Sequence, residues 1–231
     1  MNGVIAWFAD PSNWTGPGGV PVRLAEHLYY TVLALVIAAV IAIPVGLWIG
    51  HTGRGGFVVV GLANALRALP TFGLLVLLAN AFGVTIVPPI IALVVLAIPP
   101  MLAGTYAGVQ AVDRAIVDAA RGMGMDDREV LFRVELPNAL PLILGGVRSA
   151  TLQIIATATI AAYVALGGLG RFIIDGLALR DFSQMAAGSI LLALLAIGVD
   201  LLLAAVQRTV VSPGLRPATA TRTRPRLRAV S

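Results

Sequence analysis

Long apolar stretches constrain the fold of this chain more than any other feature of its sequence. A helix needs about 20 apolar residues to cross the hydrocarbon core of a bilayer. Five segments approach or exceed that length: residues 28–49, 68–82 with a continuation toward 87, 90–109, 140–166 and 185–206. A shallow apolar lead-in from Phe57 precedes the second segment. The predicted fold class is therefore an all-α membrane protein with about five transmembrane helices.

Composition supports this prediction and excludes several functions. Charged residues make up 12% of the chain, against about 25% in soluble domains. The chain has no cysteine, and all 16 basic residues are arginine, which excludes disulfides, thiolate metal sites and P-loop or Schiff-base lysines. His27 and His51 stand at opposite ends of one segment. We therefore expect no catalytic residue, no metal site and no cofactor, and nothing in the sequence indicates a nucleic-acid partner.

The distribution of arginine predicts the orientation, because arginine prefers the cytoplasmic side. Arg54 follows the first segment, four arginines follow the third, and six lie from Arg208 onward. The expected arrangement in a bacterial cell membrane has the N-terminus outside and the C-terminus in the cytoplasm. Residues 1–27 would form an extracytoplasmic segment and residues 28–209 the transmembrane domain. Residues 210–231 would form a basic, disordered tail that either anchors the topology or contacts anionic lipid.

One densely charged stretch interrupts the apolar sequence. The chain has 16 basic and 11 acidic residues, and ten of these 27 fall within residues 113–135. Two short cytoplasmic helices are predicted here. Asp113 is placed to cap the first, and Gly124 can end it in a left-handed conformation. Asp126 and Glu129 have the spacing of a capping box that starts the second helix.

The end and the surface of this stretch bear on its role. Pro137 is expected to limit the second helix, because the residue before a proline disfavours the helical conformation. The small residues of the stretch would let another backbone approach closely: Ala119, Ala120, Gly122 and Gly124. Apolar side chains add adaptable surface: Met123, Met125, Leu131 and Phe132. Two interpretations follow from the residues: a docking site for a soluble cytoplasmic partner, or an amphipathic loop that lies on the headgroups.

The spacing of this stretch resembles a known motif. Asp118-Ala119-Ala120, three residues, Gly124, nine residues, Val134, one residue and Leu136-Pro137 is similar to the EAA loop of ABC importer permeases. The usual pattern has Glu for Asp118 and Ile for Val134. In that family the loop forms coupling helices that sit in a cleft of the ATPase subunit. The resemblance implies that ATPase coupling involves Asp118, Ala119, Ala120, Met123, Gly124, Leu136 and Pro137.

The resemblance extends from about Thr31 to Val206. "IPPMLAGTYAGVQAVDRAIVDAARGMGM" and the segment around "ALGGLG" (165–170) are similar to permeases for glycine betaine, carnitine, choline and proline. "NALRALPTFGLLVL" from Asn64 resembles several importer subfamilies. The family implies a type I importer permease (MetI-like) fold and an ATP-driven importer for a compatible solute. The implied partners are separate ATP-binding subunits, an extracytoplasmic solute-binding protein that docks near "GGLG", and a second permease, identical or similar.

Two interpretations stay open for each of several residues within the apolar segments. Arg67 either snorkels to the headgroups or acts beside Pro70 at a cytoplasmic gate. Gln153 and Thr157, one helical turn apart, either line the substrate path or belong to a packing seam. The small pairs Gly145/Ser149 and Gly146/Ala150 favour such a seam, as bundle core or as dimer interface.

Asp200 separates the remaining functional hypotheses. It either pairs within the helix bundle or serves as a proton-coupling carboxylate, which would make the chain a secondary transporter. Two further hypotheses are an amino-acid or methionine ABC importer and a membrane scaffold without transport activity. ATP dependence of transport separates the two importer hypotheses from the secondary transporter and the scaffold.

Overall fold

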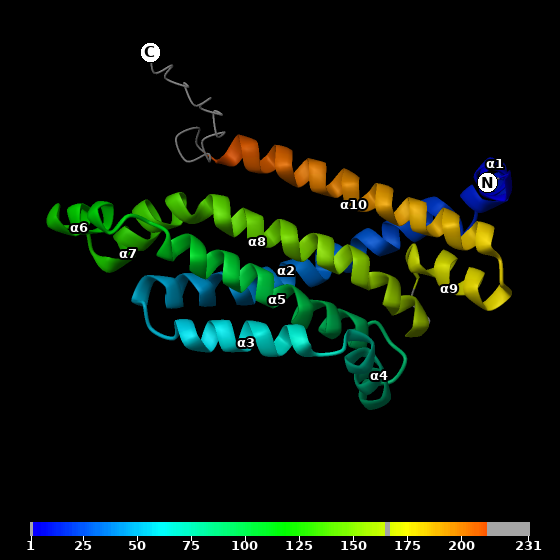
Figure 1. Ribbon diagram of the computed structural model, residues 1–231, viewed down its shortest axis with the longest axis horizontal. Helices are drawn as coiled ribbons and strands as arrows, with labels where there is room; N and C mark the ends of the chain where they lie inside the picture. The colour runs from blue at the N-terminus through cyan, green and yellow to red at the C-terminus, as the bar shows by residue number, and fades with distance from the viewer. Residues whose placement is uncertain (1, 165–166, 212–231) are drawn as a thin grey trace, which may run out of the picture.

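The computed structural model describes residues 2–164 and 167–211, and the regular structure in these residues is helical (Figure 1). At one end of the molecule lie α1 (Asn2–Ala9), the 3₁₀ turn η1 (Pro11–Trp14) and α9 (Gly170–Leu179). The long helices are α2 (Val20–Thr52), α5 (Val87–Gln110), α8 (Leu136–Thr157) and α10 (Phe182–Val210). Shorter elements are α3 (Gly56–Ala68), α4 (Thr71–Phe82), α6 (Arg114–Gly122), α7 (Asp127–Glu129), the π-helical η2 (Val130–Glu135) and the 3₁₀ helix η3 (Ala158–Val164).

Four of the five predicted spans are present as long apolar helices. Within the described residues, four helices are long and apolar enough to cross a membrane: residues 20–52, 87–110, 127–164 and 182–210. The first begins eight residues earlier than residue 28, so the segment 1–27 that was predicted as non-membrane includes the first turns of α2. The predicted fourth span ends in residues 165–166, and the basic tail continues from residue 212; both stretches lie outside the described residues.

The second predicted span is divided into two shorter helices. Leu69 leaves the helical conformation with φ −67° and ψ 125°, and α4 restarts at Thr71 after Pro70. The cause is local, because the proline ring disfavours the helical conformation of the residue before it. Both α3 and α4 pack against α5. The apolar lead-in from Phe57 is therefore a helix in its own right.

The core of the bundle consists of α2, α5 and α8, with α5 in the centre. Small residues bring the backbones together, as expected for membrane helices. A methyl group on Gly146 would lie 2.7 Å from the carbonyl oxygen of Pro100, and one on Gly46 would lie 2.7 Å from Cβ of Thr105. Gly146 and Ala150 are buried, whereas Gly145 and Ser149 are exposed. The row containing Gly146 thus belongs to the bundle core, as one of the two packing interpretations predicted.

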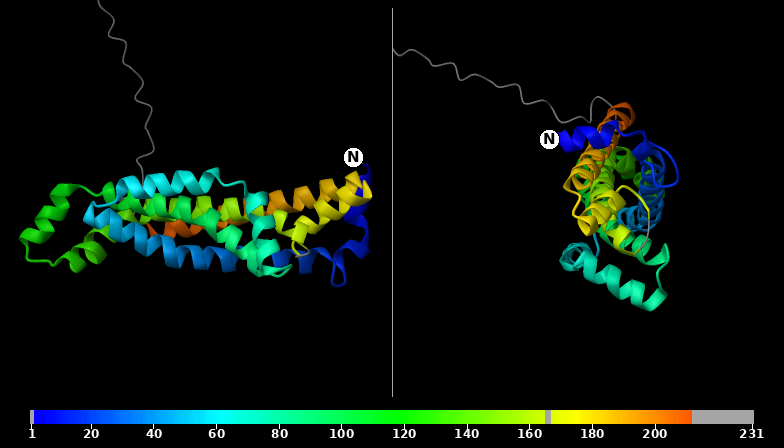
Figure 2. Two further views of the ribbon diagram at one scale, coloured as in Figure 1. Left: turned by 90° about the horizontal axis from the view of Figure 1, so that it is seen from below. Right: turned by 90° about the vertical axis from the view of Figure 1, so that its right-hand side faces the viewer.

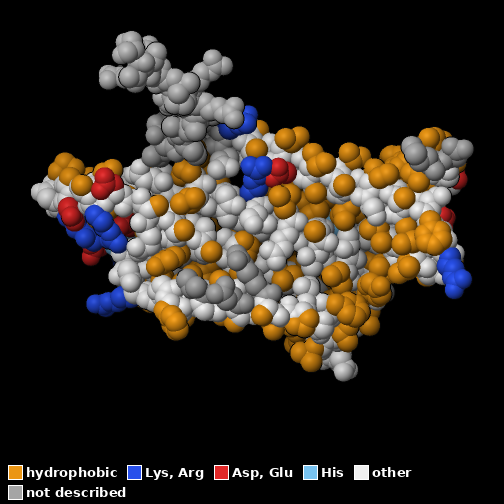
Figure 3. All heavy atoms as spheres, viewed as in Figure 1, with side chains coloured by type: hydrophobic (Ala, Val, Ile, Leu, Met, Phe, Trp, Pro, Cys, Tyr) orange, Lys and Arg blue, Asp and Glu red, His pale blue; other side chains and the backbone are white. Residues whose placement is uncertain are grey.

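The long helix α10 and the shorter helices α3 and α4 flank this core at two edges. The end view in Figure 2 places α10 at one edge, α3 and α4 at the opposite edge, and α2 on a third side. In Figure 1, α2 therefore lies behind α5 and α8, and the face toward the viewer carries no α2. Figure 3 shows hydrophobic side chains over much of this face, charged side chains toward its two ends, and one patch of blue and red between them. We call this side of the molecule, which faces the viewer in Figure 1 and lies away from α2, the open face; α8 and α10 meet on it.

Candidate functional site

The predicted coupling segment projects beyond one end of the bundle. In Figure 1 and in the left view of Figure 2, α6 and α7 lie past the ends of α2, α3 and α5, at the end opposite the N-terminus. The segment forms a helical hairpin from Asp113 to Glu135. A hairpin at this position is available to a soluble partner.

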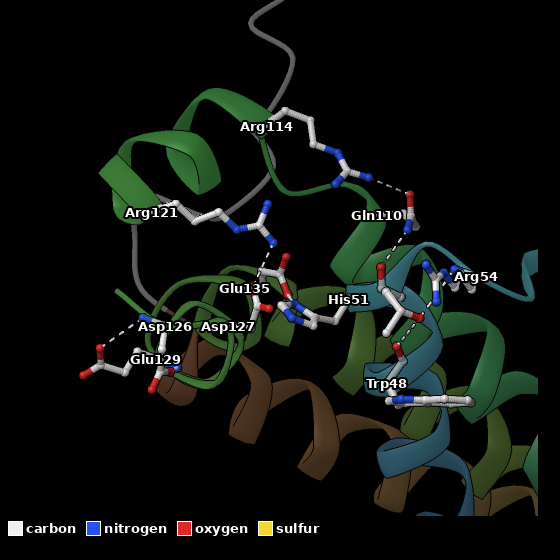
Figure 4. Close-up of polar contacts among 12 residues, drawn as sticks. Trp48, His51, Arg54, Gln110, Arg114, Arg121, Asp126, Asp127, Glu129 and Glu135 are labelled. Atoms are coloured by element: carbon white, nitrogen blue, oxygen red, sulfur yellow. Dashed lines mark hydrogen bonds and ion pairs between the residues drawn. The ribbon is translucent and has the colours of Figure 1, made fainter. Parts of the chain in front are cut away.

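The capping groups predicted from the sequence are present. Asp113 Oδ1 accepts a hydrogen bond from the amide of Ala115 at 2.9 Å. Asp126 Oδ1 accepts one from the amide of Glu129 at 2.7 Å, and Glu129 Oε2 accepts one from the amide of Asp126 at 3.3 Å. This reciprocal pair is the predicted capping box (Figure 4). Gly124 has φ +89°, a left-handed backbone conformation that residues with a side chain rarely adopt.

The helix does not stop at Pro137, so that expectation was wrong. The helix continues from α7 through η2 into α8, with Pro137 in the first turn of α8. The amide of Leu136 donates to the carbonyl of Leu131, five residues back, which is the hydrogen bond of a π-helix. The wider π turn moves the carbonyls away from the proline ring, which would otherwise clash with the carbonyl four residues earlier. The second helix of the hairpin is consequently continuous with the candidate membrane span formed by α8.

A small apolar cluster holds the two arms of the hairpin together. Val112, Val117, Ala120 and Val130 are buried against one another. Ala120 is therefore used for packing within the hairpin and is not available to an outside backbone. Met125 packs on this cluster and Leu131 on the neighbouring one. These two of the four apolar residues predicted as surface thus face inward.

Other apolar side chains of the hairpin point outward. Met123 and Phe132 are 73% and 58% exposed, and Ile116, which the sequence analysis did not single out, is 49% exposed. Asp118, Ala119 and Gly124 are also exposed, and Leu136 and Pro137 lie where the hairpin joins α8. The segment that projects past the bundle thus exposes three large apolar side chains.

Polar contacts tie the hairpin to the end of α2 (Figure 4). Arg114 donates to Gln110 Oε1 at 3.3 Å, and Gln110 in turn donates to the carbonyl of Gly50 at 2.7 Å. Arg121 forms an ion pair with Asp127 at 3.2 Å across the hairpin turn. The two arginine contacts are exposed, where ion pairs contribute little to stability, whereas the bond from Gln110 to Gly50 is part-buried. They orient the hairpin.

A buried His–Glu contact adds a second connection that sequence reasoning missed. His51 Nδ1 and Glu135 Oε2 lie 2.5 Å apart, and their side chains are 13% and 4% exposed (Figure 4). The residues are 84 positions apart in the chain. A signal was available, because Glu135 is an acid between the apolar residues Val134 and Leu136. The contact joins the π-helical turn directly to the end of α2.

The structure describes the side chains of three of the four residues suggested for a substrate path or gate. Thr157 lines a cavity of about 10 Å³ together with Thr71, Leu75 and Pro89, which is about the lower limit for one water molecule. Gln153 is half-buried on α8 and does not line that cavity. Pro70 precedes α4. Arg67 belongs to α3, and its side chain lies outside the described residues.

Asp200 has a partner in the bundle, as one of the two interpretations predicted. Its carboxylate accepts two hydrogen bonds from Arg148, from Nε to Oδ1 and from Nη2 to Oδ2, the latter at 2.5 Å. Arg148 lies in α8 and Asp200 in α10. Arg148 was not among the residues singled out from the sequence, although it lies within the predicted fourth span.

The end of the bundle opposite the hairpin contains the loop that was compared with importer permeases. The amide of Gly168 donates to Glu26 Oε2 at 2.8 Å, and Arg23 donates to the same oxygen at 3.0 Å. Ala165 and Leu166 lie outside the described residues. Among the described residues, no three His, Cys, Asp or Glu side chains cluster as metal ligands.

Comparison with known proteins decides the family. Residues 42–212 match the family described as binding-protein-dependent transport system inner membrane component. The chain belongs to this family of ABC transporter permeases. It is 33% identical over 202 residues to the glycine betaine/carnitine/choline transport system permease protein OpuCB of Bacillus subtilis, covering 87% of this chain and 93% of that protein. It is also 33% identical over 183 residues to the glycine betaine/proline betaine permease ProW of Salmonella typhimurium, covering 79% and 52%.

A solved relative confirms the permease fold. A chain of the MetNI methionine ABC transporter in an inward-facing conformation superposes with a TM-score of 0.71 at 22% identity, covering 81% of this chain and 94% of that one. The family and the fold agree with the apolar helices found here. The chain is therefore an all-α, multi-pass permease.

Proposed function

We propose that this permease is the membrane-spanning subunit of an ATP-driven importer for a compatible solute such as glycine betaine, choline, carnitine or proline. The observation that carries the proposal is the 33% identity to OpuCB over 93% of that protein's length. The choline permease OpuBB of Bacillus subtilis is 31% identical over the same share. The methionine transporter shares 22% identity and supports the fold alone, so the amino-acid importer gains no support from it.

The permease itself carries no ATPase activity in this proposal. Two ATP-binding subunits dock on the hairpin, where Met123, Phe132 and Ile116 supply apolar contacts and Asp118, Ala119 and Gly124 leave the backbone accessible. When ATP closes the ATPase pair, the hairpins are drawn together and the pathway opens outward. Hydrolysis returns it to the inward state. Leu136 and Pro137 lie where the hairpin passes this motion into α8.

The remaining partners and the orientation belong to the same proposal. The hairpin end faces the cytoplasm and the N-terminus lies outside, in a bacterial inner or cytoplasmic membrane. A solute-binding protein docks at the outer end near Gly168. A second permease completes the pathway. Both OpuCB and OpuCD of Listeria monocytogenes are named carnitine transport permeases and resemble this chain, so the second subunit is either a copy of this chain or a related permease.

A proton-coupled transporter finds less support in the structure. Both carboxylate oxygens of Asp200 accept hydrogen bonds from Arg148. A carboxylate held by a guanidinium favours its charged form, and a proton-coupling group has to alternate between two forms.

The test is co-purification with the candidate ATPase and ATP-dependent uptake of the four solutes, comparing wild type, Gly124→Val and Gly124→Asn. Val and Asn have similar size, but Asn tolerates the left-handed conformation far better. Gly124→Val should lose ATPase binding and uptake, whereas Gly124→Asn should retain most of both. Failure of the wild type to bind an ATPase, or to import any of the four solutes, would refute the proposal.

A further inference from the structure

The Arg148–Asp200 pair lies at a depth where charges are costly. Asp200 is ten residues from Val210, the last residue of α10, or about 15 Å along a helix. The 29 residues of α10 span about 44 Å, which exceeds the hydrocarbon core of about 30 Å by about 7 Å at each end. Asp200 is therefore about 8 Å inside the core, in the half nearer the coupling hairpin.

The pair is also incompletely covered. The side chains of Arg148 and Asp200 are 37% and 26% exposed. Where α8 and α10 meet on the open face, a patch of blue and red interrupts the hydrophobic surface in Figure 3. Ionisable residues within membrane spans face the bundle interior or a water-filled cavity. This part of the open face is therefore not a lipid-facing surface.

A polar groove surrounds the pair. It has a volume of about 510 Å³ and is lined by Gly145, Arg148, Ser149, Leu152, Asp200 and Gln207. Its lining combines the charged pair, Ser149 and Gln207 with Gly145 and Leu152. Charged groups at this depth face the bundle interior or water, so the groove suits water better than lipid.

The other side of α10 provides an internal comparison. A second groove, of about 420 Å³, lies between α2 and α10, and its lining is apolar throughout: Leu24, Leu28, Leu191 and Leu195 are among its residues. Successive residues of a helix turn by about 100°, which places Asp200 and Gln207 opposite Leu191 and Leu195 on α10. One side of this helix thus suits lipid, and the other suits water.

The pair retains unused hydrogen-bonding capacity. Asp200 accepts hydrogen bonds from Nε–H and from one Nη2–H of Arg148. A guanidinium has five N–H donors in total. Three donors therefore remain on Arg148, and each oxygen of Asp200 keeps a lone pair. The pair has no net charge. A solute that carries one positive and one negative group is therefore neither repelled nor held strongly by a net charge at this site.

We propose that this groove lines the aqueous solute path and that Arg148 and Asp200 form a contact site for a zwitterionic solute on its way to the cytoplasm. The remaining donors of Arg148 bind the carboxylate of the solute, and its ammonium group lies against Asp200. The solute class rests on the proposed function, whereas the aqueous character of the groove rests on the structure alone.

The absence of cysteine from the chain makes a direct test available. In the assembled transporter, Ser149→Cys introduces a single thiol into the groove. Val40→Cys is the matched control, since Val40 is exposed on α2, 12 residues from the end of α2 nearer the hairpin and on the other side of the bundle. Both variants are treated in inside-out vesicles with the charged, membrane-impermeant thiol reagent trimethylammonium-ethyl methanethiosulfonate.

The groove thiol is expected to react at least about tenfold faster than the control, because an apolar environment raises the pKa of a thiol and each unit lowers the reactive thiolate tenfold. Glycine betaine should slow the reaction. An unreactive Ser149→Cys that cross-links to another permease on oxidation would show a dry subunit seam and overturn the proposal. An unreactive thiol without such a cross-link would show a lipid-facing surface and overturn it equally.

A second variant tests the solute contact separately. Arg148→Gln with Asp200→Asn removes both charges together, so neither is left without its partner. The double variant should assemble and should raise the KM for glycine betaine at least about tenfold, as expected for loss of hydrogen bonds to charged groups. When it is combined with Ser149→Cys, the introduced thiol should keep its reactivity. An unchanged KM would show that the pair is structural. If the wild type does not import glycine betaine but the thiol of Ser149→Cys still reacts, the proposed solute is wrong. The proposal of an aqueous groove is then unaffected.

Discussion

The crossing of α5 and α8 allows a quantitative prediction for Gly146→Ala. The new Cβ would lie 2.7 Å from the carbonyl oxygen of Pro100, 3.2 Å from Cα of Gly104 and 3.3 Å from Cα of Met101. All three neighbours are backbone atoms, so no side-chain rotation relieves the contact and the helices have to separate. Overpacking of this kind costs about 1–3 kcal/mol.

Gly145→Ala is the matched control. A Cβ on Gly145 has no neighbour within 4 Å, and both substitutions gain the same helix propensity, up to about 1 kcal/mol. The difference between the two variants therefore isolates the overpacking. For a chain of this size 1 kcal/mol corresponds to about 2–4 °C in melting temperature, so Gly146→Ala should melt about 2–12 °C below Gly145→Ala.

The assay is thermal unfolding of the purified protein followed by tryptophan fluorescence. Equal melting temperatures for the two variants would refute the argument that α5 and α8 approach through glycine. A lower melting temperature for Gly145→Ala would refute the assignment of the two faces of α8.

Two further predictions concern the coupling hairpin. Asp126→Ala removes the capping box and about 1 kcal/mol of helix stability, so amide hydrogen exchange in residues 127–131 should accelerate about fivefold; unchanged exchange would contradict the role of the cap. His51→Ala leaves the buried Glu135 carboxylate without its ring partner and should destabilise the protein by about 1–3 kcal/mol. Glu135→Gln retains an oxygen that can accept from the ring and should lower the melting temperature less; the reverse order would show that the contact does not stabilise the fold.

Local sequence signals predicted the parts of the fold that local physics determines. Hydropathy identified four of the spans, because membrane helices have to be long and apolar. The hairpin caps at Asp113 and Asp126 followed from side chains that bond to amides two or three residues away. The left-handed conformation of Gly124 followed from the position of glycine after a short helix.

Long-range structure was less accessible from the sequence. The contact between His51 and Glu135 and the pairing of Arg148 with Asp200 depend on which helices become neighbours, and no local pattern states that. The continuation of the helix through Pro137 needed a π turn, whose hydrogen bonds a proline rule does not anticipate. The break at Pro70 was available from the same rule, but the apolar run around it concealed the break.

The unbroken helical run from Asp127 to Thr157 has a mechanical consequence. Close approaches of α8 to α5 run from Ala139 to Gly146. Measured from Gly146, the helix extends 19 residues to Asp127 and 11 to Thr157, which makes two arms of about 28 Å and about 16 Å. If the crossing acts as a fulcrum, a tilt of about 10° moves the hairpin end by about 5 Å and the far end by about 3 Å in the opposite direction. A displacement of the hairpin thus reaches the opposite half of the bilayer reversed in direction and reduced to about three-fifths of its size, with no break in the helix between the two ends.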